Sequence, residues 1–156
     1  MKVAVGSDHA GLSLKPAVLD AIRRAGHTPV DCGAFELDPN DDYPDFAEKV
    51  ARAVMDGRAE RGVLVCGSGV GASIAANKFR GIRSALCHDT FSARQGVEDD
   101  SMNVLALGAR VIGPALAIEV VSAFLAANFS GAERHQRRLD KVIGFETRSS
   151  DPPQSS

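Results

Sequence analysis

Residues 63–73 read VLVCGSGVGAS, an apolar run that ends in a cysteine and continues into three glycines within five positions. The uninterrupted apolar residues favour a strand that is buried on both faces. The glycines permit a tight turn, and a helix is expected to begin at Val70. A buried strand followed directly by a turn and a helix is the repeating unit of a parallel α/β sheet.

The same alternation of short apolar runs and longer amphipathic runs extends in both directions from this stretch. It predicts strands at 2–6, 28–33, 61–67, 82–87 and 103–108, and helices at 12–26, 43–57, 70–79, 90–98, 114–129 and 131–148. Right-handed crossovers place helices on both faces of such a sheet. The predicted fold is therefore a three-layer, Rossmann-like (flavodoxin-like) doubly wound α/β fold, with a five-stranded parallel sheet in the order 2-1-3-4-5.

Length and composition set the broad class of protein. A chain of 156 residues with 44% hydrophobic residues suits one globular domain, expected at 1–146, with a disordered tail at 147–156. A net charge of -2 provides no basic field for nucleic acid. Apolar runs are too short to span a membrane, and the polar start of the chain is unlike a secretory signal. We expect a cytoplasmic protein whose three cysteines are free thiols.

Two chemically distinctive stretches follow strands 1 and 3. In the order 2-1-3-4-5 the ligand crevice lies at the carboxyl ends of these strands, where GSDHAG (6–11) and CGSGVG (66–71) converge. Loop amides at a helix N-terminus favour bound anions and a cysteine thiolate, which predicts a reactive Cys66 in an anion-binding loop. The alternative is that Cys66 is a small core residue. Asp8 and His9 are candidates to orient hydroxyls, contact phosphate or move protons, the alternative for Asp8 being a helix cap.

Other candidates lie further along the chain. His88 follows strand 4 and is expected to face the same crevice. Arg134 and Arg138 are four positions apart, so they share a helical face and are able to grip one phosphate, although a solvated basic face is the alternative. Asp89 keeps a nucleotide-binding module open, because an acidic residue after a glycine loop can hold a ribose. No cysteine, histidine or carboxylate cluster has metal-ligand spacing, so no metal is predicted.

Six motifs in order resemble the type B ribose-5-phosphate isomerases, which are related to the galactose-6-phosphate isomerase subunits. They extend to about residue 140 and read GSDHAG, DYPDFA, CGSGVGASIAANK, GIRSALC, NVLALGARVIG and RHQRR. The resemblance implies a Rossmann-like fold, no metal or other cofactor, and a homodimer or dimer of dimers in which two subunits build each active site. It also implies a small-molecule sugar phosphate as the substrate, with no nucleic-acid or membrane partner.

The resemblance implies a role for each matching position. Cys66 falls on the general base, and the loop residues, Ser68 among them, fall on the amides that hold the enediolate. In part of the family a glutamate serves as the base, but here that position is Ala72. The positions matching sugar or phosphate contacts are Asp8, His9, Tyr43, Gly67, Gly69, Val70, Gly71, Asp100, Arg110, Arg134, His135 and Arg138.

One departure from the family pattern concerns ring opening. Relatives have a histidine followed by Asn or Asp where this chain has Asp99 and Asp100. The expected catalytic set is therefore Cys66, Ser68, Asp99 and His88, with Asp99 in the position of the ring-opening acid. The leading hypothesis is isomerisation of ribose 5-phosphate to ribulose 5-phosphate through a cis-enediolate. The alternatives are a tetrose or hexose phosphate substrate, a phosphosugar-binding relative with weak catalysis, and a nucleotide-binding module.

Overall fold

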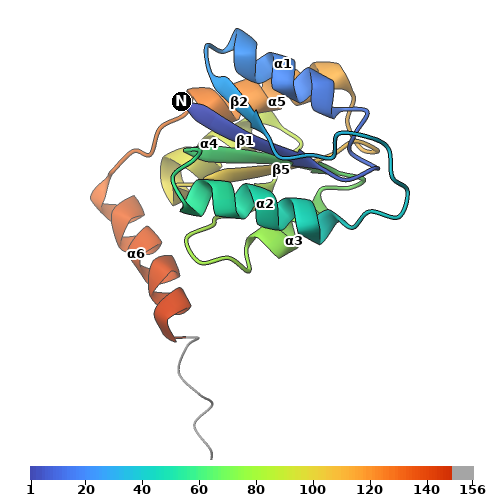
Figure 1. The fold of residues 1–156 in the computed structure, drawn as a ribbon. Helices are drawn as coiled ribbons and strands as arrows, with labels where there is room; N and C mark the ends of the chain where they lie inside the picture. The colour runs from blue at the N-terminus through green and yellow to red at the C-terminus, as the bar shows by residue number, and fades with distance from the viewer. Residues whose placement is uncertain (149–156) are drawn as a thin grey trace, which may run out of the picture.

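A computed structural model describes residues 1–148 and forms a parallel sheet between two layers of helices (Figure 1). The five strands are β1 (Lys2–Ser7), β2 (Thr28–Asp31), β3 (Arg61–Cys66), β4 (Ser84–Leu86) and β5 (Val104–Gly108). All neighbouring strands pair in parallel. The predicted fold class is confirmed.

Helices connect and flank the strands. They are α1 (Lys15–Arg24), α2 (Tyr43–Met55), α3 (Val70–Ala76), α4 (Thr90–Asp100), α5 (Pro114–Ala126) and α6 (Glu133–Arg148). The buried residues form two clusters, one on each face of the sheet. One cluster joins α1, α4 and α5 to the sheet, and the other joins α2 and α3, as right-handed crossovers require.

The strand order is 2-1-3-5-4, so the predicted order of the last two strands is wrong. All five residues of β5 are buried, which suits a strand covered by helices on both sides. The three residues of β4 are only partly covered, which suits the edge of the sheet. The chain therefore passes over to β4 first and returns to place β5 beside β3. The junction of β1 and β3, where the crevice was expected, is unchanged.

Helix α6 projects from the body of the domain (Figure 1). His135 and Leu139 are its buried residues, whereas Val142 and Ile143 are 47% and 40% exposed. The helix includes Thr147 and Arg148, the first two residues of the predicted tail. The remainder of the predicted tail, 149–156, lies outside the described residues. Within residues 1–148, no helix combines the length and apolar character needed to cross a membrane.

Candidate active site

A pocket of about 360 Å³ lies at the carboxyl ends of β1 and β3. Its walls come from the loops after β1, β3 and β5 and from the first turns of α2 and α3. It is lined by Asp8, His9, Ala10, Tyr43, Cys66, Gly67, Ser68, Gly71, Arg110 and Val111. The sequence analysis predicts all of these except Ala10 and Val111. Residues that are far apart in the chain thus meet at the junction that the topology indicated.

Cys66 is the last residue of β3 and is 5% exposed. Its sulfur accepts a hydrogen bond from the Gly69 N–H at 3.1 Å, which fixes the thiol against the glycine loop, residues 67–71. Cys66 also packs in the cluster between the sheet and α2 and α3. The two interpretations of this cysteine are therefore compatible, because the side chain is part of the core and also lines the pocket.

The glycine loop has a backbone that depends on glycine at one position in particular. Gly69 has a φ of +82°, in the left-handed region, and a Cβ there would lie 2.6 Å from Leu86 Cδ1. Val70 then begins α3, and its N–H donates to Ser68 Oγ at 3.3 Å. Gly69 and Val70 shape the loop, whereas Gly67, Ser68 and Gly71 line the pocket.

The opposite wall of the pocket comes from the loop after β1 and from α2. Asp8 Oδ1 accepts a hydrogen bond from the Gly11 N–H at 2.9 Å and closes a turn. Because α1 begins at Lys15, Asp8 does not cap that helix. Tyr43 opens α2, and its ring lies so close to Gly71 that a Cβ at Gly71 would be 2.6 Å from Tyr43 Cζ. The phenol and the carboxylate therefore border the same space as the Cys66 thiol.

Arg110 places a cation at the mouth of this space. The main-chain N–H of Arg110 donates to the Gly67 carbonyl at 3.0 Å, which connects the loop after β5 to the glycine loop. A Cβ at Gly67 would lie 3.4 Å from Arg110 Nη1, so the guanidinium stands beside the glycine loop. A guanidinium in this place is suited to a phosphate or carboxylate ligand.

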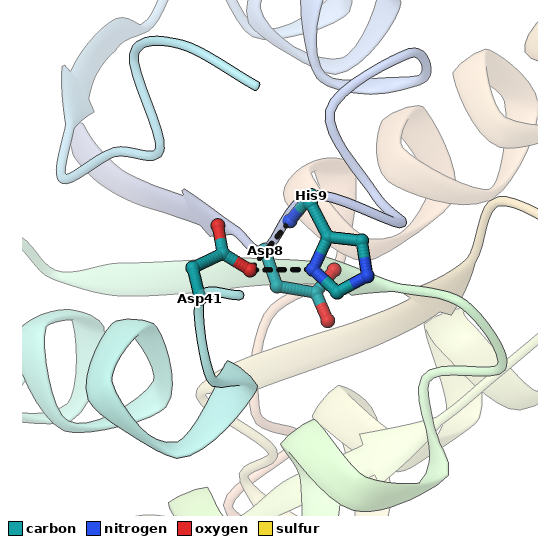
Figure 2. A group of neighbouring side chains, drawn as sticks. All are labelled: Asp8, His9 and Asp41. Atoms are coloured by element: carbon teal, nitrogen blue, oxygen red, sulfur yellow. Dashed lines mark hydrogen bonds and ion pairs between the residues drawn. The ribbon is translucent and has the colours of Figure 1, made fainter. Parts of the chain in front are cut away.

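His9 is held by a residue that the sequence analysis missed. Asp41 Oδ1 accepts hydrogen bonds from the His9 N–H at 3.0 Å and from Nδ1 at 2.6 Å (Figure 2). The hydrogen bond from His9 Nδ1 to Asp41 is the main reason why the pKa of His9 is raised above the ordinary histidine value. Asp41 lies in the long loop before α2, where no periodicity marks it. The only sequence signal is its position directly before the DYPDFA motif.

Donor atoms of Asp8, His9 and Asp41 lie within 4.8 Å of one another. His9 Nδ1 and Asp41 Oδ1 are in direct contact at 2.6 Å, whereas two atoms at right angles on one transition-metal ion are roughly 3 Å apart. His9 Nδ1 and Asp41 Oδ1 therefore bond to each other as an ion pair and do not stand apart as two metal ligands would. The absence of a metal remains a prediction.

His88 does not reach the pocket, contrary to the expectation from the predicted strand order. Because β5 lies between β3 and β4, the residue after β4 is one strand further from Cys66. His88 Nε2 accepts a hydrogen bond from the Gly108 N–H at 2.9 Å, and burial lowers the pKa of His88. A neutral His88 thus supports the end of β5, and its assignment as a catalytic residue is not supported.

Asp89 also has a local role. Its carboxylate accepts a hydrogen bond from the Ser92 N–H at 2.6 Å and caps α4. This bond lowers the pKa of Asp89. The carboxylate that a nucleotide-binding module would use for ribose is therefore engaged at a helix N-terminus.

The remaining predicted residues form a separate group, here called the distal cluster: Asp99, Asp100, Arg134, His135 and Arg138. Helix α4 begins after the carboxyl end of β4 and returns the chain to the amino end of β5. Asp99 and Asp100 therefore lie near the amino ends of the strands, whereas Cys66 lies at the carboxyl end of β3. Asp99 Oδ1 lies 3.4 Å from His135 Nδ1, and Asp99 Oδ2 accepts from Gln95. Within one chain, the distal cluster therefore does not join the pocket.

The two arginines of the distal cluster are on the exposed side of α6. Arg134 and Arg138 are four positions apart and flank the buried His135, whose Nδ1 lies 2.6 Å from Ser130 Oγ. His135 thus anchors the start of α6, while the arginines face away from the buried side of that helix. Their shared face is as predicted, but it lies outside the pocket of the same chain.

The profile of the Ribose/Galactose Isomerase family matches residues 3–142. The chain belongs to this family. It is 42% identical over 147 residues to ribose-5-phosphate isomerase B of Escherichia coli, covering 94% of this chain and 97% of that protein. It is 44% identical over 131 residues to D-erythrulose-4-phosphate isomerase of Pectobacterium atrosepticum, covering 84% and 86%. The family predicted from the six motifs is confirmed.

Solved structures of the family share the fold. Ribose-5-phosphate isomerase B from Mycoplasma genitalium, determined with bound ribulose-5-phosphate, superposes with a TM-score of 0.87 at 41% identity. The superposition covers 94% of this chain and 96% of that one. The family match therefore accounts for most of the described chain and extends into the projecting helix α6.

The contact of His88 predicts how stability responds to pH. Because its folded-state pKa is below the ordinary value, the unfolded chain binds more protons, and stability falls as pH drops below about 6.5. His88→Gln retains an acceptor for the Gly108 N–H but does not titrate. We expect denaturant unfolding at fixed protein concentration to show a smaller stability loss between about pH 7 and pH 5 in His88→Gln than in wild type.

The same variant tests whether His88 is catalytic. We expect His88→Gln to keep its isomerase rate at pH 7.5 within about threefold, since general acid–base catalysis is typically worth about 10²- to 10⁴-fold. A loss of that larger size, with unchanged stability, would restore His88 to the catalytic set.

Proposed function

We propose that this chain is an aldose–ketose isomerase of sugar phosphates, and that it converts ribose 5-phosphate to ribulose 5-phosphate. The observation that carries the proposal is the Cys66 thiol, held by the Gly69 N–H at 3.1 Å in a pocket beside a glycine loop and an arginine. The names of the relatives from Escherichia coli and Mycoplasma genitalium support the same substrate.

The proposed reaction moves one proton between neighbouring carbons. Cys66, as the thiolate, removes the proton from C2 of the open-chain aldose, and a hydroxyl proton passes from O2 to O1 in the cis-enediolate. The proton returns to C1 to give the ketose, so atoms and charge balance without a cofactor. The Cys66 sulfur accepts a hydrogen bond from the glycine loop and matches the position of the family's general base, which is why we assign it this role.

The other pocket residues are proposed to bind and orient the substrate. Amides of the glycine loop stabilise the enediolate oxygen, since preorganised N–H donors act where charge develops. Arg110 and His9 contact the phosphate, and this remote binding places C2 against the sulfur. Asp8 and Tyr43 border the sugar, where their oxygens are able to bond to its hydroxyls.

We also propose that the enzyme is a homodimer, or a dimer of dimers, in which the distal cluster of one copy completes the pocket of the other. Within one chain the two parts of the predicted site lie at opposite ends of the sheet. Helix α6 projects from the body and exposes Val142 and Ile143, a pattern typical of an interface helix (Figure 1). Arg134 and Arg138 of a second copy would then clamp the phosphate.

A second candidate substrate is a tetrose phosphate. Asp99 occupies the position of the family's ring-opening histidine, and its Oδ2 is engaged by Gln95. A tetrose 4-phosphate has no free hydroxyl at C4, so it does not close a furanose ring and needs no ring-opening acid. The relative from Pectobacterium atrosepticum is named D-erythrulose-4-phosphate isomerase.

A reducing compartment such as the cytoplasm is proposed for either activity, because all three cysteines are unpaired.

Replacing the proposed base tests the reaction itself. Cys66→Ala is expected to lower kcat by about 10³-fold and to abolish exchange of the C2 proton with solvent, because nothing else in the pocket stands in the same place. Isomerisation is followed by ketose formation, and exchange by NMR in deuterated water. Cys32→Ala, which removes a thiol outside the pocket, should retain activity. Saturable sugar-phosphate binding to wild type without exchange would instead indicate a non-catalytic binding protein.

Complementation tests the shared site. Cys66→Ala and the double variant Arg134→Ala/Arg138→Ala should each be nearly inactive as homodimers. Co-expressed with different tags, they form hybrids in which one of the two sites keeps both intact parts. Purified hybrids should therefore recover about half of the wild-type activity per dimer. Hybrids as inactive as the two parents would mean that each chain builds its site alone.

Position 99 separates the two candidate substrates. Asp99→His is expected to raise kcat/KM for ribose 5-phosphate by at least about tenfold, because it restores an acid for ring opening. The same variant should leave kcat/KM for D-erythrulose 4-phosphate within about twofold, since that substrate has no ring to open. Initial rates with both compounds give the comparison. Equal effects on the two substrates would show that Asp99 has no part in ring opening.

A further inference from the structure

The Asp41–His9 pair has a geometry that does more than fill space. One oxygen, Asp41 Oδ1, accepts from two atoms of the same residue, the main-chain N–H at 3.0 Å and Nδ1 at 2.6 Å. These two bonds fix both the backbone and the ring of His9. The side chain of Asp41 is 10% exposed, whereas that of His9 is 31% exposed and lines the pocket.

The contact also determines which ring nitrogen carries a proton. A carboxylate is a pure acceptor, so Nδ1 must be the donor. The other nitrogen, Nε2, points away from Asp41 (Figure 2). In the neutral ring Nε2 is then a bare acceptor, which repels a phosphate oxygen. Nε2 becomes a donor only when the ring takes a second proton.

We propose that Asp41 is a positioning residue that holds His9 as an imidazolium with its Nε2–H directed at the substrate phosphate. The proposal rests on the proposed sugar-phosphate site. It assigns a function to a loop residue that lies outside the six family motifs and that contacts the substrate through His9 alone.

The charges around His9 agree with this assignment. The hydrogen bond to Asp41 is the main cause that raises the pKa of His9, and the charge of Asp8 acts in the same direction. Desolvation of the ring and, more weakly, the charge of Arg110 act in the opposite direction. Asp41 Oδ2 is buried and has no hydrogen-bond partner among the described residues. A carboxylate with one buried oxygen lacking a partner is stabilised when a cation stands against its other oxygen, which favours the charged form of His9.

Asp41→Asn tests the proposal, because the amide oxygen still accepts from Nδ1–H but the charge is lost. The pKa of His9 should fall, so Nε2 loses its proton at a lower pH. KM for ribose 5-phosphate should therefore begin to rise at lower pH than in wild type, and should be about tenfold higher than in wild type at pH 8. The kcat value should change by less than about twofold, because His9 does not contact the reacting carbons.

Three control variants isolate the charge. Asp41→Glu keeps the carboxylate and should restore much of the wild-type pH profile. Asp45→Asn removes the same charge from an exposed position on α2 and should leave the profile unchanged. In a His9→Gln background, Asp41→Asn should have no further effect on KM, because the group through which it acts is absent. An additive effect in that background would overturn the proposal.

A measurement without turnover separates this proposal from the proposed function. The His9 ring is titrated by NMR, and binding of inorganic phosphate is measured by calorimetry at pH 8. We expect His9 to titrate at lower pH in Asp41→Asn, and phosphate to bind about tenfold more weakly. An unchanged His9 titration would overturn the role of Asp41. So would a fall in kcat together with a rise in KM if neither change depended on pH. Absence of isomerase activity with intact phosphate binding would overturn only the proposed function.

Discussion

The site depends on close contacts between the backbones that leave the carboxyl ends of three neighbouring strands. A Cβ at Gly11 would lie 2.2 Å from the Val65 carbonyl oxygen, and a Cβ at Gly108 would lie 2.5 Å from that of Ser68. Both distances are below any real contact of a side chain, so both positions require glycine. The loop after β1 packs against β3, and the end of β5 packs against the glycine loop, so close backbone packing surrounds Cys66. Preorganisation of the pocket is thus a property of main-chain packing.

Sequence periodicity predicts the elements of this fold well but does not determine which strands are neighbours. The alternation of apolar runs gives five strands and both helical layers, since burial imposes the same pattern wherever a strand sits in the sheet. The positions of β4 and β5 depend on how much of each is covered. VLALG is apolar throughout and fully buried, whereas SAL is short and partly exposed. Exchanging these two strands moves His88 away from β3 and turns a predicted catalytic residue into a structural one.

The candidate site divides into parts that sequence can and cannot predict. Asp8, His9 and Cys66 are predictable because they lie at the carboxyl ends of two parallel strands, and these ends must lie on the same side of the sheet. The distal cluster is assigned through family motifs, which give a position in the chain but no position in space. Helix α4 runs back to the amino end of β5, so Asp99 and Cys66 lie at opposite ends of the strands in the same chain. Asp41 escapes both routes, because it lies in an irregular loop whose path is fixed by tertiary contacts.

Two carboxylates lie at or next to a pocket proposed for an anion, since Asp8 lines it and Asp41 contacts His9, and their hydrogen bonds explain why this is tolerable. Asp8 directs one oxygen to the Gly11 N–H, and Asp41 directs one oxygen to two donors of His9. Each charge is therefore partly neutralised by its own hydrogen-bond donors. His9 and Arg110 line the space beside the glycine loop together with Asp8, so two cationic side chains accompany one carboxylate there. Asp41, in contact with His9, helps to keep that ring charged, because an imidazolium without Asp41 would lose its proton more readily just where a phosphate dianion is the dominant form.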